Sequence, residues 1–274
     1  MNKLITSVQH PDVKLVKALS RRKERRAQGL FVIEGLRFVE EAVGAGAPLV
    51  KVYCTKQLFQ AARGRKLVEK LTGQGVTVQE VSLPVLEKMT DTEQPQGILA
   101  TVRLAAPAWP AFPQARTFML VCDKIQDPGN LGTIIRTADA AGVQAIFTTV
   151  GTVDVYNPKV LRSTMGSIFH LPVFTELEAG KVIEMLTERG VTPIGTALSA
   201  EQVHFTTDFC RPLALWLGSE ATGIEDSVLK QLPELTKIPM PGRAESLNVA
   251  VAAGILMFEC VRQRTAGRPA GQRA

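Results

Sequence analysis

Apolar residues recur with two alternating periods along the first hundred residues. Short apolar runs, typical of strands, alternate with longer segments whose apolar residues recur every three or four positions, as in helices. The expected strands are 30–35, 49–55, 76–82 and 97–104, and the expected helices are 10–29, 36–46, 58–75 and 83–91. This pattern predicts a small α/β domain. It contains no glycine-rich nucleotide-binding loop, so its predicted role is docking rather than catalysis.

From residue 117 onwards the strands are near-continuous apolar runs separated by helices. The expected strands are 117–125, 145–150, 191–198, 213–218 and 235–240, and the expected helices are 130–142, 157–169, 177–190, 224–232 and 248–264. Continuous apolar strands between helices are typical of a parallel sheet covered on both faces. In such sheets ligands bind at the carboxyl ends of the strands.

A proline-rich stretch, RLAAPAWPAFPQAR, separates the two patterns at residues 103–116. Its prolines recur at every third position, which favours an extended interdomain linker. The predicted domains are therefore residues 1–103, a linker at 104–116, a second domain at 117–266 and a basic tail at 267–274.

Basic residues gather at both ends of this 274-residue chain, whose net charge is +6. Residues 1–30 hold eight lysines and arginines against two acidic residues, and residues 261–274 add four arginines and no acid. Two basic clusters indicate a polyanionic partner, most simply a nucleic acid. The absence of a long apolar segment or an apolar leader predicts no membrane span and a cytoplasmic location.

The residue types that bind metals are scattered. The chain has four cysteines and three histidines, none of which cluster, and it has no C-x-x-C pair. Structural zinc sites need such clusters, so no metal site is predicted.

Polar residues concentrate in three loops that follow predicted strands. In the first, DKIQDPGNLGTIIRTADAAG, Asn130 lies at or near a helix start, and Arg136 follows among apolar neighbours. An arginine in apolar surroundings needs an anionic partner. In the second, LWLGSEATGIED, Glu220 lies between Gly218 and Gly223, and glycines allow a close approach of backbone to a ligand.

The third loop, MPGRAESLNVAVAAG, contains several polar side chains close together. It places Glu245, Ser246 and Asn248 before an apolar run at 249–258. A helix N-cap needs only one such residue and contributes ~1 kcal/mol. Either these groups cap the helix or some of them bind a ligand. None of the three loops matches a dinucleotide or phosphate-binding motif, and no nucleophile triad is evident.

Taken in order, the segments NLGTIIR, LGSEATGI and IPMPGRAESLNVAVAAG resemble the three signature motifs of the SpoU (TrmH-type) RNA ribose 2′-O-methyltransferases of the SPOUT superfamily. The resemblance covers about residues 117–265, including YNPKVLRSTMGSIFHLPV between the first two motifs. The segment RRKERRAQGLFVIEGLRFVEEAV resembles the small α/β, ribosomal-protein-like RNA-binding domain that precedes many members of the family.

The resemblance implies a fold and a cofactor. The second domain would be an α/β SPOUT domain with a parallel sheet and a deep trefoil knot near its C-terminus, acting as a homodimer with the active site completed across the interface. S-adenosylmethionine would be the methyl donor, and no metal would be needed. Carried over by motif, the cofactor-binding residues would be Thr196, Gly218, Ile238, Met240 and Leu247.

The resemblance also implies a catalytic set. Carried over by motif, it is Asn130, Arg136, Glu220, Ser246 and Asn248. The family mechanism uses the arginine to assist loss of the 2′-hydroxyl proton. A guanidinium stays protonated at neutral pH and is a poor proton acceptor, so we expect Arg136 instead to bind phosphate and stabilise developing alkoxide charge. Asn130, Ser246 and Asn248 would orient the hydroxyl, and Glu245 has no assigned role.

The expected function is therefore S-adenosylmethionine-dependent 2′-O-methylation of RNA. Ribosomal RNA is the favoured substrate, since the extra first domain suits a structured loop, and transfer RNA is the alternative. A non-catalytic RNA- or ribosome-binding protein on the same fold would be expected to lose Arg136 or the Asn/Ser set, which this chain retains. A nucleotide-binding oxidoreductase fits the alternating pattern but lacks its glycine motif.

Overall fold

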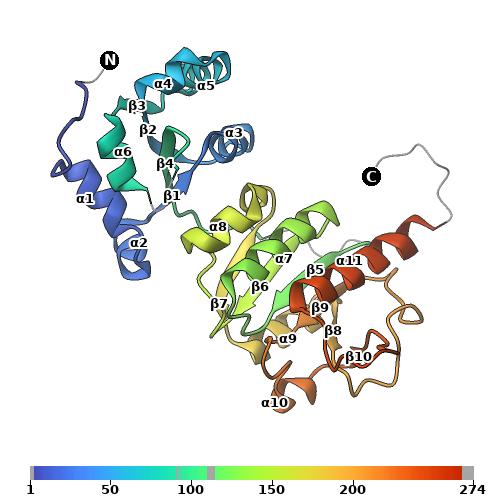
Figure 1. Cartoon of the computed structure of the whole chain (residues 1–274). Coiled ribbons are helices and arrows are strands. Elements are labelled where there is room, and N and C mark those ends of the chain that lie inside the picture. Colours follow the sequence, from blue (N-terminus) through green and yellow to red (C-terminus); the bar gives the residue numbers. More distant parts are fainter. Residues whose placement is uncertain (1–2, 91, 93, 110–114, 267–274) are drawn as a thin grey trace. The chain divides into compact units, whose positions relative to one another are not determined.

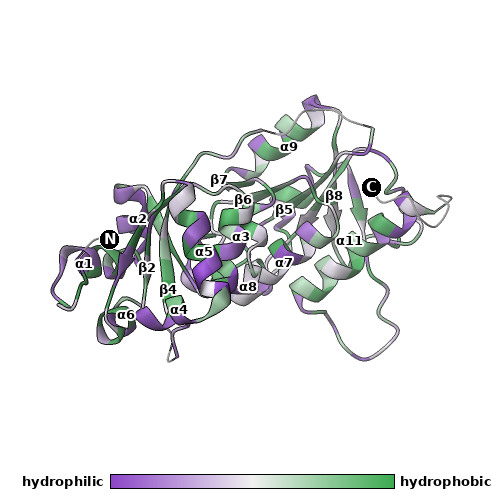
Figure 2. Ribbon diagram, turned by 90° about the horizontal axis from the view of Figure 1, so that it is seen from above, coloured by the Kyte–Doolittle hydropathy of each residue, from purple (hydrophilic) through white to green (hydrophobic). Residues whose placement is uncertain are grey.

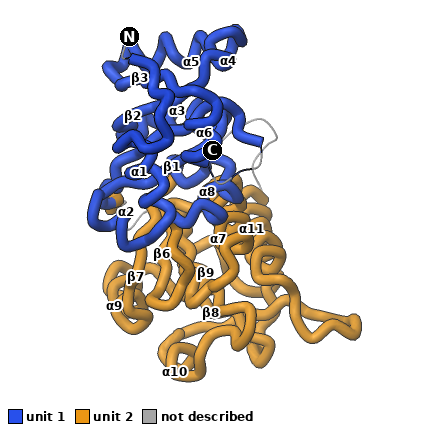
Figure 3. Tube along the Cα trace, turned by 60° about the vertical axis from the view of Figure 1, so that its left-hand side comes forward, with its two compact units in different colours: residues 1–106, 156–170 blue, residues 107–155, 171–274 orange. Residues whose placement is uncertain are grey.

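The chain folds into two compact units. The computed structural model describes residues 3–90, 92, 94–109 and 115–266 (Figure 1). Unit 1 consists of residues 1–106 and 156–170, and unit 2 of residues 107–155 and 171–274 (Figure 3). Unit 1 therefore takes a segment from the second half of the chain. The expected basic tail lies outside the described residues.

Unit 1 is built on a four-stranded mixed sheet in the order β1-β4-β2-β3. Strand β4 is antiparallel to β1 and β2, and β2 is parallel to β3. The strands are β1 (Leu30–Glu34), β2 (Leu49–Cys54), β3 (Thr77–Glu80) and β4 (Ile98–Arg103). The helices of its first segment are α1 (Pro11–Ala18), α2 (Arg22–Gln28), α3 (Leu36–Gly44), α4 (Lys56–Gln60), α5 (Ala62–Gly73) and α6 (Leu83–Met89). All four predicted strands are present.

Two helices predicted to be continuous are each broken in two. The prediction of one helix over 10–29 is wrong because the buried Arg25 turns back and donates to the carbonyls of Leu19 and Ser20, at 2.8 and 2.7 Å. These carbonyls belong to the connection between α1 and α2. The prediction over 58–75 is wrong because α5 packs tightly on the end of α4. A Cβ at Gly64 would lie 2.2 Å from the Leu58 carbonyl oxygen.

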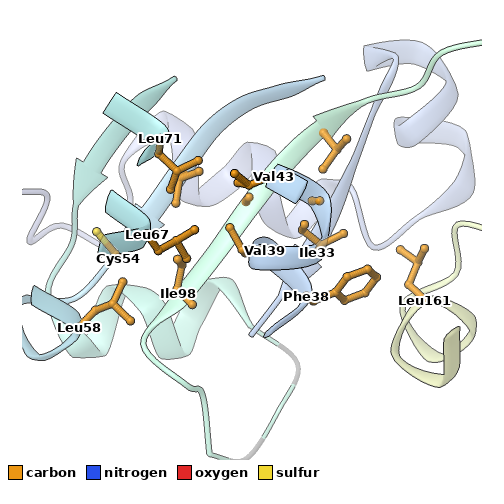
Figure 4. Close-up of a cluster of buried hydrophobic side chains, with 14 of the residues drawn as sticks. Ile33, Phe38, Val39, Val43, Cys54, Leu58, Leu67, Leu71, Ile98 and Leu161 are labelled. Carbon is orange, nitrogen blue, oxygen red and sulfur yellow. The ribbon is translucent and has the colours of Figure 1, made fainter. Parts of the chain in front are cut away.

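The core of unit 1 includes side chains from the later segment, 156–170. This segment holds helix α8 (Pro158–Thr164) and a short 3-10 helix, Ser167–Phe169. Leu161 of α8 lies beside Phe38 of α3 in the buried cluster (Figure 4). The ring of Phe169 meets that of Phe38 edge-on, with centroids 5.6 Å apart. Residues 156–170 are thus part of this core.

Unit 2 contains a six-stranded, entirely parallel sheet in the order β10-β8-β9-β5-β6-β7. The strands are β5 (Phe118–Cys122), β6 (Ala145–Thr149), β7 (Val173–Leu177), β8 (Thr192–Thr196), β9 (Leu213–Leu217) and β10 (Glu234–Thr236). The helices are α7 (Pro128–Ala140), α9 (Ala179–Glu188), α10 (Asp226–Leu229) and α11 (Val249–Thr265). Strands β5, β6 and β9 are buried along their whole length, which confirms the predicted parallel α/β sheet (Figure 2).

Two features of the connection from β6 to α9 differ from the prediction. Strand β7 was not expected. It lies at the edge of the sheet and buries only Val173 and Phe174, so its apolar run is too short to be recognised. The helix expected over 157–169 ends at Thr164, because Met165 and Gly166 both adopt left-handed conformations. A left-handed residue satisfies the last carbonyls of a helix and stops it.

Arg264 anchors helix α11 to the segments that precede strands β5 and β9. Its half-buried guanidinium donates to the carbonyls of Phe209 (2.7 Å), Arg116 (2.7 Å), Arg211 (2.8 Å) and Thr117 (3.1 Å). Burial lowers the pKa of Arg264, although the nearby Cys260 and Cys210 oppose the shift. Arg262 pairs with Glu259. Both arginines in the described part of this basic segment, Arg262 and Arg264, therefore have partners within the chain.

Candidate active site at the carboxyl edge of the parallel sheet

The three polar loops follow strands β5, β9 and β10. These strands are parallel, so all three loops begin at the carboxyl edge of the sheet in unit 2. At the first loop, helix α7 is capped by Asp127, whose Oδ1 accepts the Asn130 N–H at 2.7 Å, and Pro128 occupies its first position. Asn130 therefore lies in the first turn of α7 rather than at the cap. Its side chain is left to make other contacts.

Glu220 holds the first loop to the second. Its carboxylate accepts the backbone N–H groups of Gln126 (3.1 Å) and Asp127 (3.3 Å) and the side-chain amide of Asn130 (3.0 Å). Partial burial opposes ionisation of Glu220. The hydrogen bonds from Asn130 and the backbone outweigh it and lower the pKa of Glu220 below its ordinary value. The carboxylate is thus a fixed anion that organises the loop.

Asn248 joins the third loop to the other two. Its Oδ1 accepts the N–H groups of Ala250 (2.9 Å) and Val251 (3.3 Å), so Asn248 is the N-cap of α11. Its Nδ2 donates to Oδ1 of Asn130 at 3.0 Å. The helix N–H groups at one end and the Glu220 carboxylate at the other fix the orientation of both amides. Glu220, Asn130 and Asn248 form one hydrogen-bonded chain.

A buried carboxylate that sequence reasoning missed ties the strand ends together beneath this chain. Asp123 follows β5 directly and is 2% exposed. It accepts the hydroxyl of Thr149 at 2.5 Å and the indole N–H of Trp216 at 3.2 Å. The sequence carries one signal for this role, which is that Asp123 directly follows a continuous apolar strand. A buried carboxylate at such a position needs hydrogen-bond donors from neighbouring strands.

A cavity of about 540 Å³ opens beside the hydrogen-bonded chain. It is lined by all five residues expected to bind a cofactor: Thr196, Gly218, Ile238, Met240 and Leu247. Glu220 and Ser246 also line it. The cavity mixes apolar side chains with the backbone of strand ends, and its volume lies within the ~300–1,000 Å³ range of small-molecule sites.

The glycine at the end of β9 has a structural reason. A Cβ at Gly218 would lie 2.2 Å from the carbonyl carbon of Gly223. The backbone of the loop closes on itself there, with Ser219 and Gly223 exchanging two hydrogen bonds of 2.9 and 3.0 Å. Gly218 therefore allows a tight turn that holds Glu220 at the rim of the cavity.

Arg136 lies apart from this arrangement. Its neighbours Ile134, Ile135 and Ala138 are fully buried, but Arg136 is on the exposed face of α7 and does not line the cavity. With 3.6 residues per turn, Arg136 lies off the buried face that its apolar neighbours form. Six residues also rotate it by about 120° from Asn130. Within the described residues its side chain has no hydrogen bond or ion pair.

The two remaining residues of the third loop are exposed. Ser246 lines the cavity and has no side-chain hydrogen bond in the part of the chain that the structure describes. Glu245 lies next to it without an evident role. Residues 3–90, 92, 94–109 and 115–266 contain no group of three side chains suited to holding a metal ion. None of their helices has the length and apolarity needed to cross a membrane.

Comparison with known proteins decides the family. Residues 117–258 match the SpoU rRNA Methylase family, and residues 10–100 match the MRM3-like substrate binding domain. The chain belongs to the SpoU rRNA methylase family. The 23S rRNA (guanosine(2553)-2′-O)-methyltransferase RlmP of Bacillus subtilis is 37% identical over 93% of this chain and 98% of its own. A Synechocystis sp. protein named as an uncharacterized tRNA/rRNA methyltransferase is 37% identical over 97% of this chain and 96% of its own.

Solved structures of SpoU-family proteins share the fold. An AdoMet-bound rRNA methyltransferase from Sinorhizobium meliloti has a TM-score of 0.86 and 32% identity, covering 95% of this chain and 98% of its own. The methyltransferase AviRb from Streptomyces viridochromogenes, in complex with AdoMet, has a TM-score of 0.85 and 28% identity, covering 94% and 100%. These findings confirm the expected class, an RNA 2′-O-methyltransferase that uses S-adenosylmethionine.

Proposed function

We propose that this SpoU-family enzyme methylates a ribose 2′-hydroxyl of ribosomal RNA in the cytoplasm. The observation that carries the proposal is the cavity of about 540 Å³ adjoining the chain Glu220–Asn130–Asn248. A cofactor site and a set of fixed polar groups thus share one edge of the sheet. Relatives named as 23S rRNA methyltransferases supply the substrate class.

The residues around the cavity fit S-adenosylmethionine. Ile238, Met240 and Leu247 offer an apolar slot for an adenine ring, and backbone at Thr196 and Gly218 offers donors and acceptors. When bound, the cofactor supplies a methyl group already activated by its sulfonium charge. We propose that the loops after β8, β9 and β10, which line this cavity, form a deep trefoil knot.

Each side chain of the catalytic set has a different task in the proposed mechanism. Asn130 and Asn248 hold one another and Glu220 in place, each with donor capacity left for the substrate. The Ser246 hydroxyl is open to contact the ribose. Glu220 fixes the loop rather than moving a proton, since its pKa is lowered. Arg136 binds RNA phosphate and stabilises charge that develops on the 2′-oxygen.

We propose that the active site is completed in a homodimer. Val251, Ile255 and Phe258 are exposed at helical spacing along α11. An exposed apolar stripe of this kind marks a protein interface. Helix α11 packs on α7, which carries Arg136. A second copy covering the stripe would bring its Arg136 to a site that lacks one.

The predicted domains keep their roles in this proposal. Residues 1–103 bind the RNA substrate, 104–116 link the domains, 117–266 carry the methyltransferase site, and 267–274 form a basic tail. Support for the first comes from the match of residues 10–100 to a substrate binding domain.

The proposal is tested by cofactor binding and by mapping the product. Calorimetric titration should show binding of S-adenosylmethionine and none of NAD. Mapping 2′-O-methyl groups in RNA from cells with and without the protein should show one position in ribosomal RNA that depends on it. A dependent position in transfer RNA would change the substrate. Binding of RNA without any transfer of methyl would identify a non-catalytic RNA-binding protein.

A further inference from the structure

A groove runs through unit 1 beside β1 and the start of α3. It consists of two cavities of about 240 and 60 Å³, which share Glu34, Phe38 and Arg162 as lining residues. The larger also reaches Arg37 and Met165, and the smaller reaches Lys17. The groove therefore joins α1, β1 and α3 to α8, the helix supplied by the later segment of unit 1.

The charges of this groove that have no partner are positive. Arg37 and Arg162 are both exposed. Within the described residues neither guanidinium makes a hydrogen bond or ion pair. The only acidic side chain that lines the groove in those residues is Glu34, and its carboxylate accepts the hydroxyl of Thr92. Two guanidiniums without protein partners, flanking a cavity, suit a phosphate backbone.

The larger cavity has the mixed lining of a base-binding site. The amides of Gln94 and Gln96 supply donors and acceptors. Gln96 is fixed because its Oε1 accepts the Leu36 N–H at 3.1 Å, which leaves its NH₂ group to donate. Phe38 and Met165 supply apolar surface. A volume of about 240 Å³ is below the usual range for a whole drug-sized ligand, so it suits a fragment such as one base.

Met165 is kept at the rim of this cavity in an unfavourable conformation. Its φ is +52°, a left-handed value at a helix end, where glycine is usual. The next residue, Gly166, has φ +104°, and a Cβ there would lie 2.8 Å from Cβ of Glu41. Met165 is nevertheless 43% exposed, so burial of its side chain does not offset the cost of this backbone conformation. Residues with a strained backbone conformation of this kind concentrate at ligand-binding sites.

We propose that this groove binds a single-stranded segment of the RNA substrate, with phosphates on Arg37 and Arg162 and one unstacked base against Met165 in the larger cavity. A base in a duplex is stacked and paired, and could not enter a cavity of this size. The proposal rests on the proposed function, since that function supplies an RNA substrate.

Fluorescence anisotropy with a labelled 12-nucleotide single-stranded RNA tests the phosphate contacts. The wild type should bind this RNA more tightly than the same strand in a duplex, and adenosine or guanosine monophosphate should not displace it at equal concentration. The double variant Arg37→Ala/Arg162→Ala should raise Kd at least tenfold and reduce the slope of log K against log salt by about 1.4. The matched control is Arg65→Ala on α5, another exposed arginine without a partner in the described chain.

Any of three results would overturn the proposal. They are an unchanged Kd in the double variant, an equal loss in Arg65→Ala, and tighter binding of the duplex or of a mononucleotide. Titration of S-adenosylmethionine and methyl transfer to ribosomal RNA separate this failure from failure of the proposed function. If both persist in the wild type while the double variant binds RNA normally, only the groove is wrong.

The variant Met165→Gly tests the base contact without loss of folding. Glycine relieves the left-handed conformation, so Tm should stay the same or rise. Removal of the side chain should nevertheless raise Kd for the single strand severalfold and leave binding of the duplex unchanged. A Kd equal to that of the wild type would show that no base lies against Met165.

Discussion

The polar groups of the two units differ in how they are partnered. At the carboxyl edge of unit 2, Glu220, Asn130 and Asn248 bind one another and the backbone before any substrate arrives. In the groove of unit 1, Arg37 and Arg162 have no partner within the described chain. Catalysis gains from groups fixed in advance, whereas a polyanion brings its own partners for cations. The difference is the one expected between the proposed catalytic site and the proposed RNA-binding groove.

Arg136 is the charged residue of the proposed catalytic set that breaks this pattern, since it is exposed and, like the groove arginines, has no partner in the described residues. Arg136→Ala should lower the rate of methyl transfer by about 10²–10³-fold, the usual cost of removing one group that stabilises developing charge. Affinity for S-adenosylmethionine, measured by calorimetry, should not change. Thr133→Ala, on the same exposed face of α7, is the control and should be near normal. A transfer rate within threefold of wild type for Arg136→Ala would remove it from the catalytic set.

Two arginines near the end of α11 allow a similar contrast, between a side chain with many partners and one with few, to be tested through the free energy of unfolding. Arg264→Met leaves four carbonyls without their donor and should lower the free energy of unfolding by about 2 kcal/mol. Arg262→Met removes the pair with Glu259, whose carboxylate keeps the hydrogen bond from Gln263, and should cost less than Arg264→Met. Urea denaturation measures both. Equal losses would mean that the carbonyl contacts of Arg264 contribute no more than the ion pair between Arg262 and Glu259.

Asn248 has two tasks that one substitution separates. Asn248→Asp keeps an acceptor for the first N–H groups of α11 but cannot donate to Asn130, so methyl transfer should fall about tenfold, as for loss of one ~1.4 kcal/mol contact. Its stability should stay near that of the wild type. Asn248→Ala loses the cap as well and should cost a further ~1 kcal/mol of stability. Transfer at the normal rate in Asn248→Asp would show that the bond to Asn130 does not matter.

The smallest expected effect is the acid dependence of Glu220. Its pKa is lowered in the folded protein, so its ionised form stabilises the fold fully above the ordinary glutamate value of ~4.3. That contribution is lost as pH falls through the lower, folded pKa. The difference in Tm between wild type and Glu220→Gln should therefore be constant from pH 8 to 5 and shrink below pH 4. A difference that already shrinks between pH 7 and 6 would contradict a lowered pKa.

The polar loops could be predicted from the sequence, but the choice among their residues could not. Continuous apolar strands predict a parallel sheet, and parallel strands bring their carboxyl ends to one edge, so the loops at Asn130, Glu220 and Ser246 had to be neighbours. Which of Glu245, Ser246 and Asn248 caps α11 depends on the exact backbone path, and the structure selects Asn248. The apolar neighbours of Arg136 in the sequence leave its exposure open, and its position on the outer face of α7 decides it.

The breaks in helices were beyond prediction because contacts between consecutive helices cause them. Arg25 binds the carbonyls that end α1, and Gly64 meets Leu58 at a distance that depends on how α4 and α5 fold together. Strand β7 was missed because an edge strand buries few residues, so its pattern is short. Periodicity reports burial along one element, and these features are set by contacts between elements.

The contribution of residues 156–170 to unit 1 has a consequence for synthesis of the chain. Phe31 and Phe38 pack against Tyr156 and Phe169, which leave the ribosome well after β4 is complete. At ~5–20 residues per second, this delay amounts to several seconds. During that interval the nascent unit presents an aromatic face to the solvent. The most vulnerable moment for aggregation should therefore fall between the emergence of β4 and that of α8, and a fragment ending in the linker would remain in that state permanently.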